Sequence, residues 1–74
     1  METYELELIG QLAPNHDELR RLVYLHGGYE EELTRLESVR FPSEAERREI
    51  SRIKRLKLRG KDRIRTILQA HAKG

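Results

Sequence analysis

Residues 19–36 read LRRLVYLHGGYEEELTRL, and the spacing of their large side chains governs how this chain folds. These side chains recur three and four residues apart in strict alternation, at Leu19, Leu22, His26, Tyr29, Leu33 and Leu36. A helix has 3.6 residues per turn, so the alternation places them in one stripe along one side of a helix. So narrow a stripe is typical of a helix that packs lengthwise against another helix.

The helix that carries this stripe is predicted over residues 16–39. Asn15 and Glu18 have the spacing of a capping box, which favours a start near His16. Gly27 and Gly28 interrupt the pattern, and each costs about 1 kcal/mol relative to alanine inside a helix. We therefore expect a kink or local fraying at the two glycines.

A shorter amphipathic helix is predicted before it, over residues 2–12. Its apolar face is formed by Tyr4, Leu8, Ile9 and Leu12. Pro14 ends this helix, because proline disfavours the helical conformation in the residue before it.

A second long helix is predicted over residues 44–72, after a turn over residues 40–43. Pro42 stops the preceding helix, and Ser43 with Glu46 forms a capping box at the start of the next one. This helix also carries one stripe, at Ile50, Ile53, Leu56, Gly60, Ile64, Ile67 and Leu68. Together the elements predict an all-α fold in a single domain, residues 1–74: an antiparallel, coiled-coil-like two-helix hairpin with a short N-terminal helix.

The two stripes match in one register of this hairpin. The layers pair Leu36 with Ile50, Leu33 with Ile53, Tyr29 with Lys57, His26 with Gly60, Leu22 with Ile64 and Leu19 with Ile67. The same register predicts two flanking ion pairs, Glu37 with Arg47 and Glu30 with Lys54. Since four of the six layers are aliphatic on both sides, we expect a hairpin joined by apolar contacts.

Three apolar residues on the other edge of the hairpin have no partner inside two helices. They are Leu25, Val39 and Leu56. Burying one leucine fully is worth about 1.5–3 kcal/mol, so we expect something to cover this edge. The candidates are the helix over residues 2–12 folding back, or a second copy of the chain.

Composition excludes several other classes of protein. The chain has 74 residues, 36% of them apolar and 38% charged, and no cysteine, so disulfides and thiolate metal sites are ruled out. We expect no membrane span, no signal peptide and a cytoplasmic location, since no apolar run approaches about 20 residues. Residues 1–41 carry a net charge of −5 and residues 42–74 one of +7, so the two halves are expected to pair with each other.

The histidines are the first candidates for a site. His26 faces Gly60 and suggests either a pH-sensitive or ligand-binding notch, or a half-buried histidine that fills the space left by the glycine. The second interpretation is favoured, because the facing layers carry no second histidine or carboxylate. His16 and His71, with Asp17 nearby, form only a weak metal pattern. We predict no catalytic residue, cofactor, metal or small-molecule substrate, because no nucleophile with an adjacent base and no phosphate-binding glycine loop is present.

Ten basic residues lie between Arg47 and Arg65, which raises a nucleic-acid hypothesis. The residues that would carry it are Arg48, Arg52, Arg55, Arg59 and Arg63. Against it, the basic residues surround the helix, Glu46, Glu49 and Asp62 lie beside or among them, and this helix has no aromatic side chain.

The chain resembles the YdcH-like family of small bacterial helical-hairpin proteins. The resemblance rests on residues 4–9 (YELELI), on Pro14-Asn15-His16, on residues 32–37 (ELTRLE) and above all on residues 53–62 (IKRLKLRGKD). Gly60 departs from the pattern, because the family tends to have leucine there. The resemblance implies a helical hairpin in a bacterial cytoplasm and assigns no catalytic residue.

These observations predict a small non-enzymatic interaction or structural module. We expect it to form a homo-oligomer, or to bind another helical protein, through the edge of Leu25, Val39 and Leu56. The alternative is a nucleic-acid or ribosome-associated protein that uses the arginines of its last helix.

Overall fold

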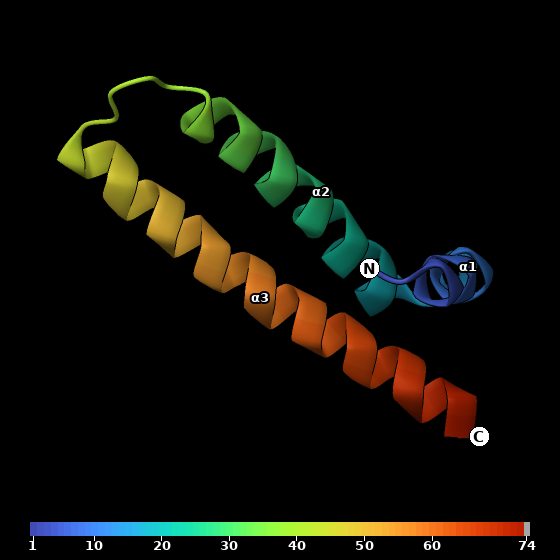
Figure 1. Ribbon diagram of the computed structural model, residues 1–74. Coiled ribbons are helices and arrows are strands. Elements are labelled where there is room, and N and C mark those ends of the chain that lie inside the picture. The colour runs from blue at the N-terminus through green and yellow to red at the C-terminus, as the bar shows by residue number, and fades with distance from the viewer. Residues whose placement is uncertain (74) are drawn as a thin grey trace.

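The structure is a computed structural model, which describes residues 1–73. It contains three α-helices and a 3₁₀ turn: α1 (Thr3–Leu12), η1 (Ala13–Asn15), α2 (Asp17–Glu37) and α3 (Glu44–Lys73). Helices α2 and α3 run side by side in opposite directions, and α1 lies across them at the end remote from the turn (Figure 1). The predicted all-α hairpin is confirmed. Within residues 1–73, no helix is both long and apolar enough to cross a membrane.

The start of α2 differs from the prediction. Ala13–Asn15 forms the 3₁₀ turn η1, and the residue after it, His16, has an extended backbone and caps α2. The backbone N–H of Leu19 donates to Nδ1 of His16 at 3.1 Å. The predicted capping box of Asn15 and Glu18 is therefore wrong, because Asn15 already belongs to the turn.

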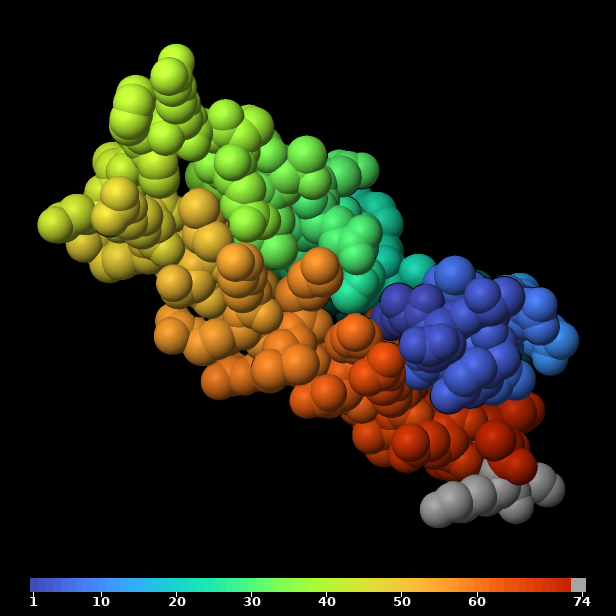
Figure 2. Space-filling model, viewed as in Figure 1, coloured from blue at the N-terminus to red at the C-terminus, as the bar shows by residue number. Residues whose placement is uncertain are grey.

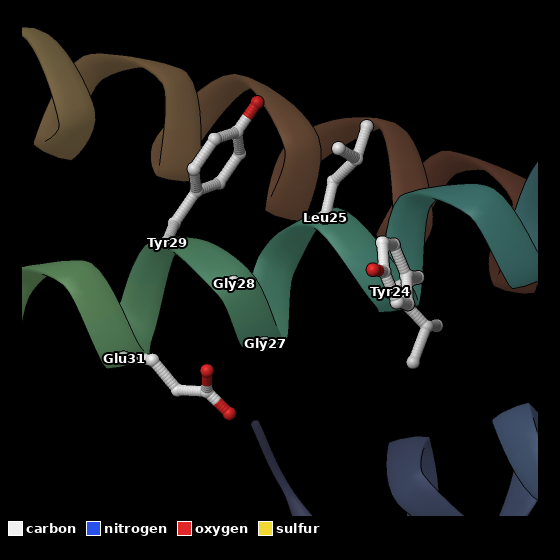
Figure 3. Close-up of a pocket in the computed structure, with 7 residues that line it drawn as sticks. Tyr24, Leu25, Gly27, Gly28, Tyr29 and Glu31 are labelled. Carbon is white, nitrogen blue, oxygen red and sulfur yellow. The ribbon is translucent and has the colours of Figure 1, made fainter.

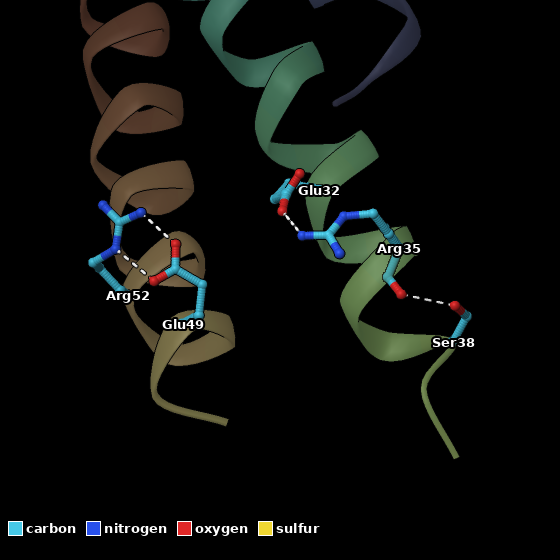
Figure 4. Close-up of polar contacts among 5 residues, drawn as sticks. All are labelled: Glu32, Arg35, Ser38, Glu49 and Arg52. Atoms are coloured by element: carbon cyan, nitrogen blue, oxygen red, sulfur yellow. Dashed lines mark hydrogen bonds and ion pairs between the residues drawn. The ribbon is translucent and has the colours of Figure 1, made fainter. Parts of the chain in front are cut away.

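The turn between the long helices follows the prediction more closely. The N–H of Ser43 donates to Oε1 of Glu46 at 2.8 Å, and the N–H of Glu46 donates to Oγ of Ser43 at 3.1 Å, which confirms the second capping box. Helix α2 ends at Glu37, two residues before the predicted end, and the hydroxyl of Ser38 donates to the carbonyl oxygen of Arg35 (Figure 4). The expected fraying at Gly27 and Gly28 is wrong, because α2 stays helical through both.

Two hydrophobic clusters form the core. The open-end cluster comprises Leu19, Ile64, Ile67 and Leu68, with Met1, Leu8, Ile9, Leu12, Ala13, Leu22 and Val23 packed around it. The turn-end cluster comprises Leu33, Leu36 and Ile53, with Tyr29 and Ile50 beside it. Each of the four predicted aliphatic layers has both of its members in one cluster. The layer of His26 and Gly60 lies between the two clusters, since neither residue belongs to either of them.

Two ion pairs join the long helices along the edge that carries Glu30 and Glu37, but not with the predicted partners. Lys54 Nζ lies 3.6 Å from Glu37, and Lys57 Nζ lies 3.6 Å from Glu30. The predicted pairs of Glu37 with Arg47 and Glu30 with Lys54 are wrong. Side chains lean toward the N-terminus of their helix, so Glu37 leans away from the turn and meets Lys54, which leans toward it.

Candidate functional site

Helix α1 covers only one edge of the hairpin. Its apolar residues pack onto Val23 of α2 and Leu68 of α3, which lie on the same side of the seam. Figure 2 shows α1 seated against the C-terminal part of α3, at the end of the molecule away from the turn. One of the two covers proposed for Leu25, Val39 and Leu56 is thereby excluded, because α1 occupies the opposite edge.

A partly buried ion pair holds α1 in this position. Glu5 is only 6% exposed and accepts a hydrogen bond from Nε of Arg65 on α3 at 2.9 Å. It also accepts from the backbone N–H of Glu2 at 2.9 Å, at the start of the helix. The hydrogen bond from Arg65, followed by that from Glu2, holds the pKa of the Glu5 carboxyl below its ordinary value.

This pair was not predicted from the sequence, although the sequence contains a signal for it. Glu5 precedes Leu8 and Ile9 by three and four residues, so it lies on the same face as they do. Tyr4, which was assigned to that face instead, is 62% exposed. The position of Glu5 on the apolar face of α1 is therefore the feature of the sequence that indicates its contact with α3.

We call the other edge, formed by Leu25, Val39 and Leu56, the uncovered edge. Leu25 is 40% exposed and Val39 is 36% exposed, while Leu56 is half-buried. Residues 1–73 supply no third helix on this side of the seam. The predicted interface residues thus lie on a surface open to solvent.

A hollow over the glycine pair adjoins this edge. It is lined by Val23, Tyr24, Leu25, Gly27, Gly28, Tyr29 and Glu31, all of them on α2. Figure 3 shows Leu25 and Tyr29 extending to the same side of α2, with the bare backbone of Gly28 between their positions. A Cβ atom built on Gly28 meets no described atom within 4 Å, so another helix can approach the backbone closely here.

Three ion pairs frame the uncovered edge, each within one chain. Arg63 Nε donates to Glu18 at 2.8 Å across the two helices. Toward the turn, Arg35 pairs with Glu32 on α2 and Arg52 pairs with Glu49 on α3 (Figure 4).

In each of these pairs, the hydrogen bond from the arginine lowers the pKa of the carboxyl group, so all three carboxylates are charged at neutral pH. These three carboxylates beside the uncovered edge are therefore neutralised locally.

The histidines take structural positions. His26 Nε2 lies 3.0 Å from Glu30 Oε1, and within the described chain its buried Nδ1 has no hydrogen-bond partner. His26 also lines a cavity of about 190 Å³ between α1 and the hairpin. His16 and His71 line one hollow at the open end, but Nδ1 of His16 is already used as the helix cap. Residues 1–73 contain no group of three or more potential metal ligands.

The arginines of the nucleic-acid hypothesis divide into two groups. Arg52 and Arg63 hydrogen-bond to Glu49 and Glu18 beside the uncovered edge. Arg48, Arg55 and Arg59 are exposed, and only Arg48 comes as near as 4.0 Å to a carboxylate of the described chain, that of Glu44.

Comparison of the chain with protein-family models, with curated proteins and with solved structures found no match. The resemblance to the YdcH-like family and the cytoplasmic location stay predictions from the sequence.

Proposed function

We propose that this chain is a small non-enzymatic interaction module that pairs with a second copy of itself through the uncovered edge. The observation that supports the proposal is the unequal cover of the two edges. Val23 and Leu68 are packed under α1, whereas Leu25 on the opposite edge is 40% exposed. The apolar seam between α2 and α3 has two edges, and α1 covers only one of them.

A symmetric pairing would use the same residues twice. In a two-fold dimer the same patch of each copy meets its counterpart, so each leucine of the uncovered edge is buried on both copies. Full burial of a leucine is worth about 1.5–3 kcal/mol, and Leu25 and Leu56 retain part of that free energy in the single chain. Gly28 lets the partner helix approach closely.

The charges favour a second copy over a strongly charged partner. Glu18, Glu32 and Glu49 are each paired with an arginine of their own chain, so the edge offers apolar side chains within a nearly neutral frame. A strongly basic protein would find none of these three carboxylates free. A second copy presents the same neutral, apolar surface and is therefore the best match.

Sedimentation equilibrium of Leu25→Glu tests the proposal. Leu25 lies on the uncovered edge and is partly exposed, so the glutamate is expected to leave the hairpin folded and to reduce the mass to that of one chain. Leu58→Glu is the matched control, because Leu58 is 59% exposed and lies off the edge. Its mass should equal that of the unmodified protein.

A monomeric unmodified protein would overturn the proposal, as would a Leu25→Glu protein whose mass is unchanged. Leu56→Glu extends the test to α3. Because Leu56 is half-buried, this variant is expected to dissociate and partly unfold, so its helix content is measured alongside its mass.

A further inference from the structure

The basic residues of α3 fall into two groups, those with a carboxylate nearby and those without one. Six of the ten residues between Arg47 and Arg65 lie within 4.0 Å of a carboxylate: Arg48, Arg52, Lys54, Lys57, Arg63 and Arg65. The other four, Arg47, Arg55, Arg59 and Lys61, have no carboxylate that near in the described part of the chain. Only four of these six, Lys54, Lys57, Arg63 and Arg65, pair with the acidic half, so that pairing accounts for only part of the positive charge.

Four arginines form a stripe along α3, which we call the arginine stripe: Arg48, Arg52, Arg55 and Arg59. Their spacing of four, three and four residues keeps them on one side of a helix. At 100° per residue, Arg48, Arg55 and Arg59 lie about 120–160° around the helix from the buried Ile53 and so face away from α2, while Arg52 lies about 100° from it. Its N-terminal part borders a hollow lined by Arg47, Arg48, Ser51 and Arg55.

We propose that the arginine stripe binds the phosphate backbone of a nucleic-acid duplex without reading its sequence. A guanidinium group donates two parallel hydrogen bonds to a phosphate, which makes arginine well suited to this contact. The stripe spans eleven residue steps, or about 16 Å, along which a duplex presents a continuous row of charges. The hydroxyl of Ser51 adds a neutral donor in the same hollow.

The composition of α3 restricts the contact to the backbone of a duplex. The helix has no aromatic side chain, so it offers no surface on which the bases of a single strand could stack. Backbone contacts position a protein on a duplex but carry no sequence information. We therefore expect similar affinity for unrelated sequences.

A membrane surface is the less suitable anionic partner. A helix that lies on a membrane buries a broad apolar face in the lipid, and the apolar face of α3 is packed against α2 instead. Among the large apolar side chains of the described part of α3, Leu58 alone is exposed. The arginines remain as the main contact surface.

Fluorescence anisotropy with a labelled duplex of about 20 base pairs tests the proposal, with DNA and RNA as separate arms. The logarithm of the binding constant should fall linearly with the logarithm of salt concentration, with a slope of about −3 to −4 for three or four phosphate contacts. Arg55→Gln with Arg59→Gln should reduce the size of the slope by about two. Glutamine is a good helix former, so the fold is expected to persist.

Arg20→Gln with Arg21→Gln is the matched control, since it removes the same two charges from α2. Equal losses in the two double variants would overturn the proposal, because net charge alone would then explain the binding. Absence of binding to both duplexes at about 50 mM salt would overturn it as well. So would preferential binding to vesicles of an anionic phospholipid, whereas binding to either duplex with the expected slopes supports it.

This inference is independent of the proposed self-association. The two surfaces share Arg52, which pairs with Glu49 beside the uncovered edge, whereas Arg48 and Arg55 face away from α2. Leu25→Glu should therefore abolish the dimer and leave the binding of one chain to the duplex measurable. Loss of one property without the other would identify which proposal fails.

Discussion

The two hydrophobic clusters are built from similar residues, yet they are closed to different degrees. In the open-end cluster, Leu19 and Ile64 are fully buried, because α1 adds a third wall to the two long helices. In the turn-end cluster, Leu33 and Leu36 retain some exposure, and within residues 1–73 the surrounding residues come from α2 and α3 alone. The two fully buried side chains, Leu19 and Ile64, thus lie where a third helix crosses the seam, although Ile67 of the same cluster keeps 8% exposure.

The comparison also shows what a small chain must supply beyond matched helices. The charged residues outnumber the apolar ones slightly in percentage, 38% against 36%, so the core is confined to a stripe. Helix α1 closes that stripe at one end and on one edge. The other edge and the turn end depend on the two long helices, and there an added partner would have the greatest effect.

The largest expected effect comes from truncating one leucine in each cluster. Leu19→Ala and Leu36→Ala remove the same atoms from α2, and a buried leucine replaced by alanine costs about 2–5 kcal/mol. We expect Leu19→Ala to fall near the upper limit, because the three helices around it cannot all close the cavity. Urea denaturation of both variants, measured by circular dichroism, gives the difference. Equal costs would contradict the role assigned to α1.

A smaller effect is expected from Glu5→Gln, which weakens the contact between α1 and α3. Hydrogen exchange should rise in α1 and in the N-terminal half of α2, and stay unchanged at the turn-end cluster. Glu32→Gln is the matched control, since Glu32 pairs with Arg35 within α2, beside the edge that α1 leaves uncovered. Uniform exchange throughout the chain would show that the two clusters unfold together.

The same variant has a defined pH dependence. Arg65 lowers the pKa of Glu5 below the ordinary value of 4.5, so the folded protein binds this proton less readily than the unfolded chain. The stabilisation is therefore present above about pH 4.5 and is lost as the pH falls through the lowered pKa. We expect Glu5→Gln to lose stability at neutral pH and to match the unmodified protein in acid, as measured by urea midpoints across this range. A constant difference at every pH would count against a charged Glu5.

Periodicity and turn chemistry were sufficient to predict the hairpin. Three features were recognisable in the sequence alone because each is local or strictly periodic. They are the alternation from Leu19 to Leu36, the proline at position 42 and the capping box at Ser43. The aliphatic layers followed because the two stripes match in an antiparallel register with the turn near Phe41. The identity of the uncovered edge came from the same heptad assignment.

The features that failed depend on three-dimensional position. The cap at His16 required knowing that Ala13–Asn15 forms a 3₁₀ turn, and the partner of Glu37 required the direction in which side chains lean. The contact of Glu5 with Arg65 joins residues 60 positions apart. No local pattern specifies which edge α1 crosses, because either edge offers apolar residues.

The smallest expected effect tests the gap between the two clusters. Gly60 of α3 lies in the layer of His26, and a Cβ atom built there meets no described atom within 4 Å, as is also true of Gly27 on the exposed side of α2. Alanine at either site should therefore stabilise the protein by a similar amount, up to about 1 kcal/mol, from helix propensity alone.

Leucine separates the two sites, because Gly60 is half-buried between the clusters and Gly27 is exposed. Gly60→Leu should raise the urea midpoint more than Gly27→Leu, since its side chain can join the open-end and turn-end clusters into one core. A loss of stability for Gly60→Leu would mean that His26 already fills the layer. The His26 side chain, and not the lack of a side chain at Gly60, would then be the reason why the two clusters are separate.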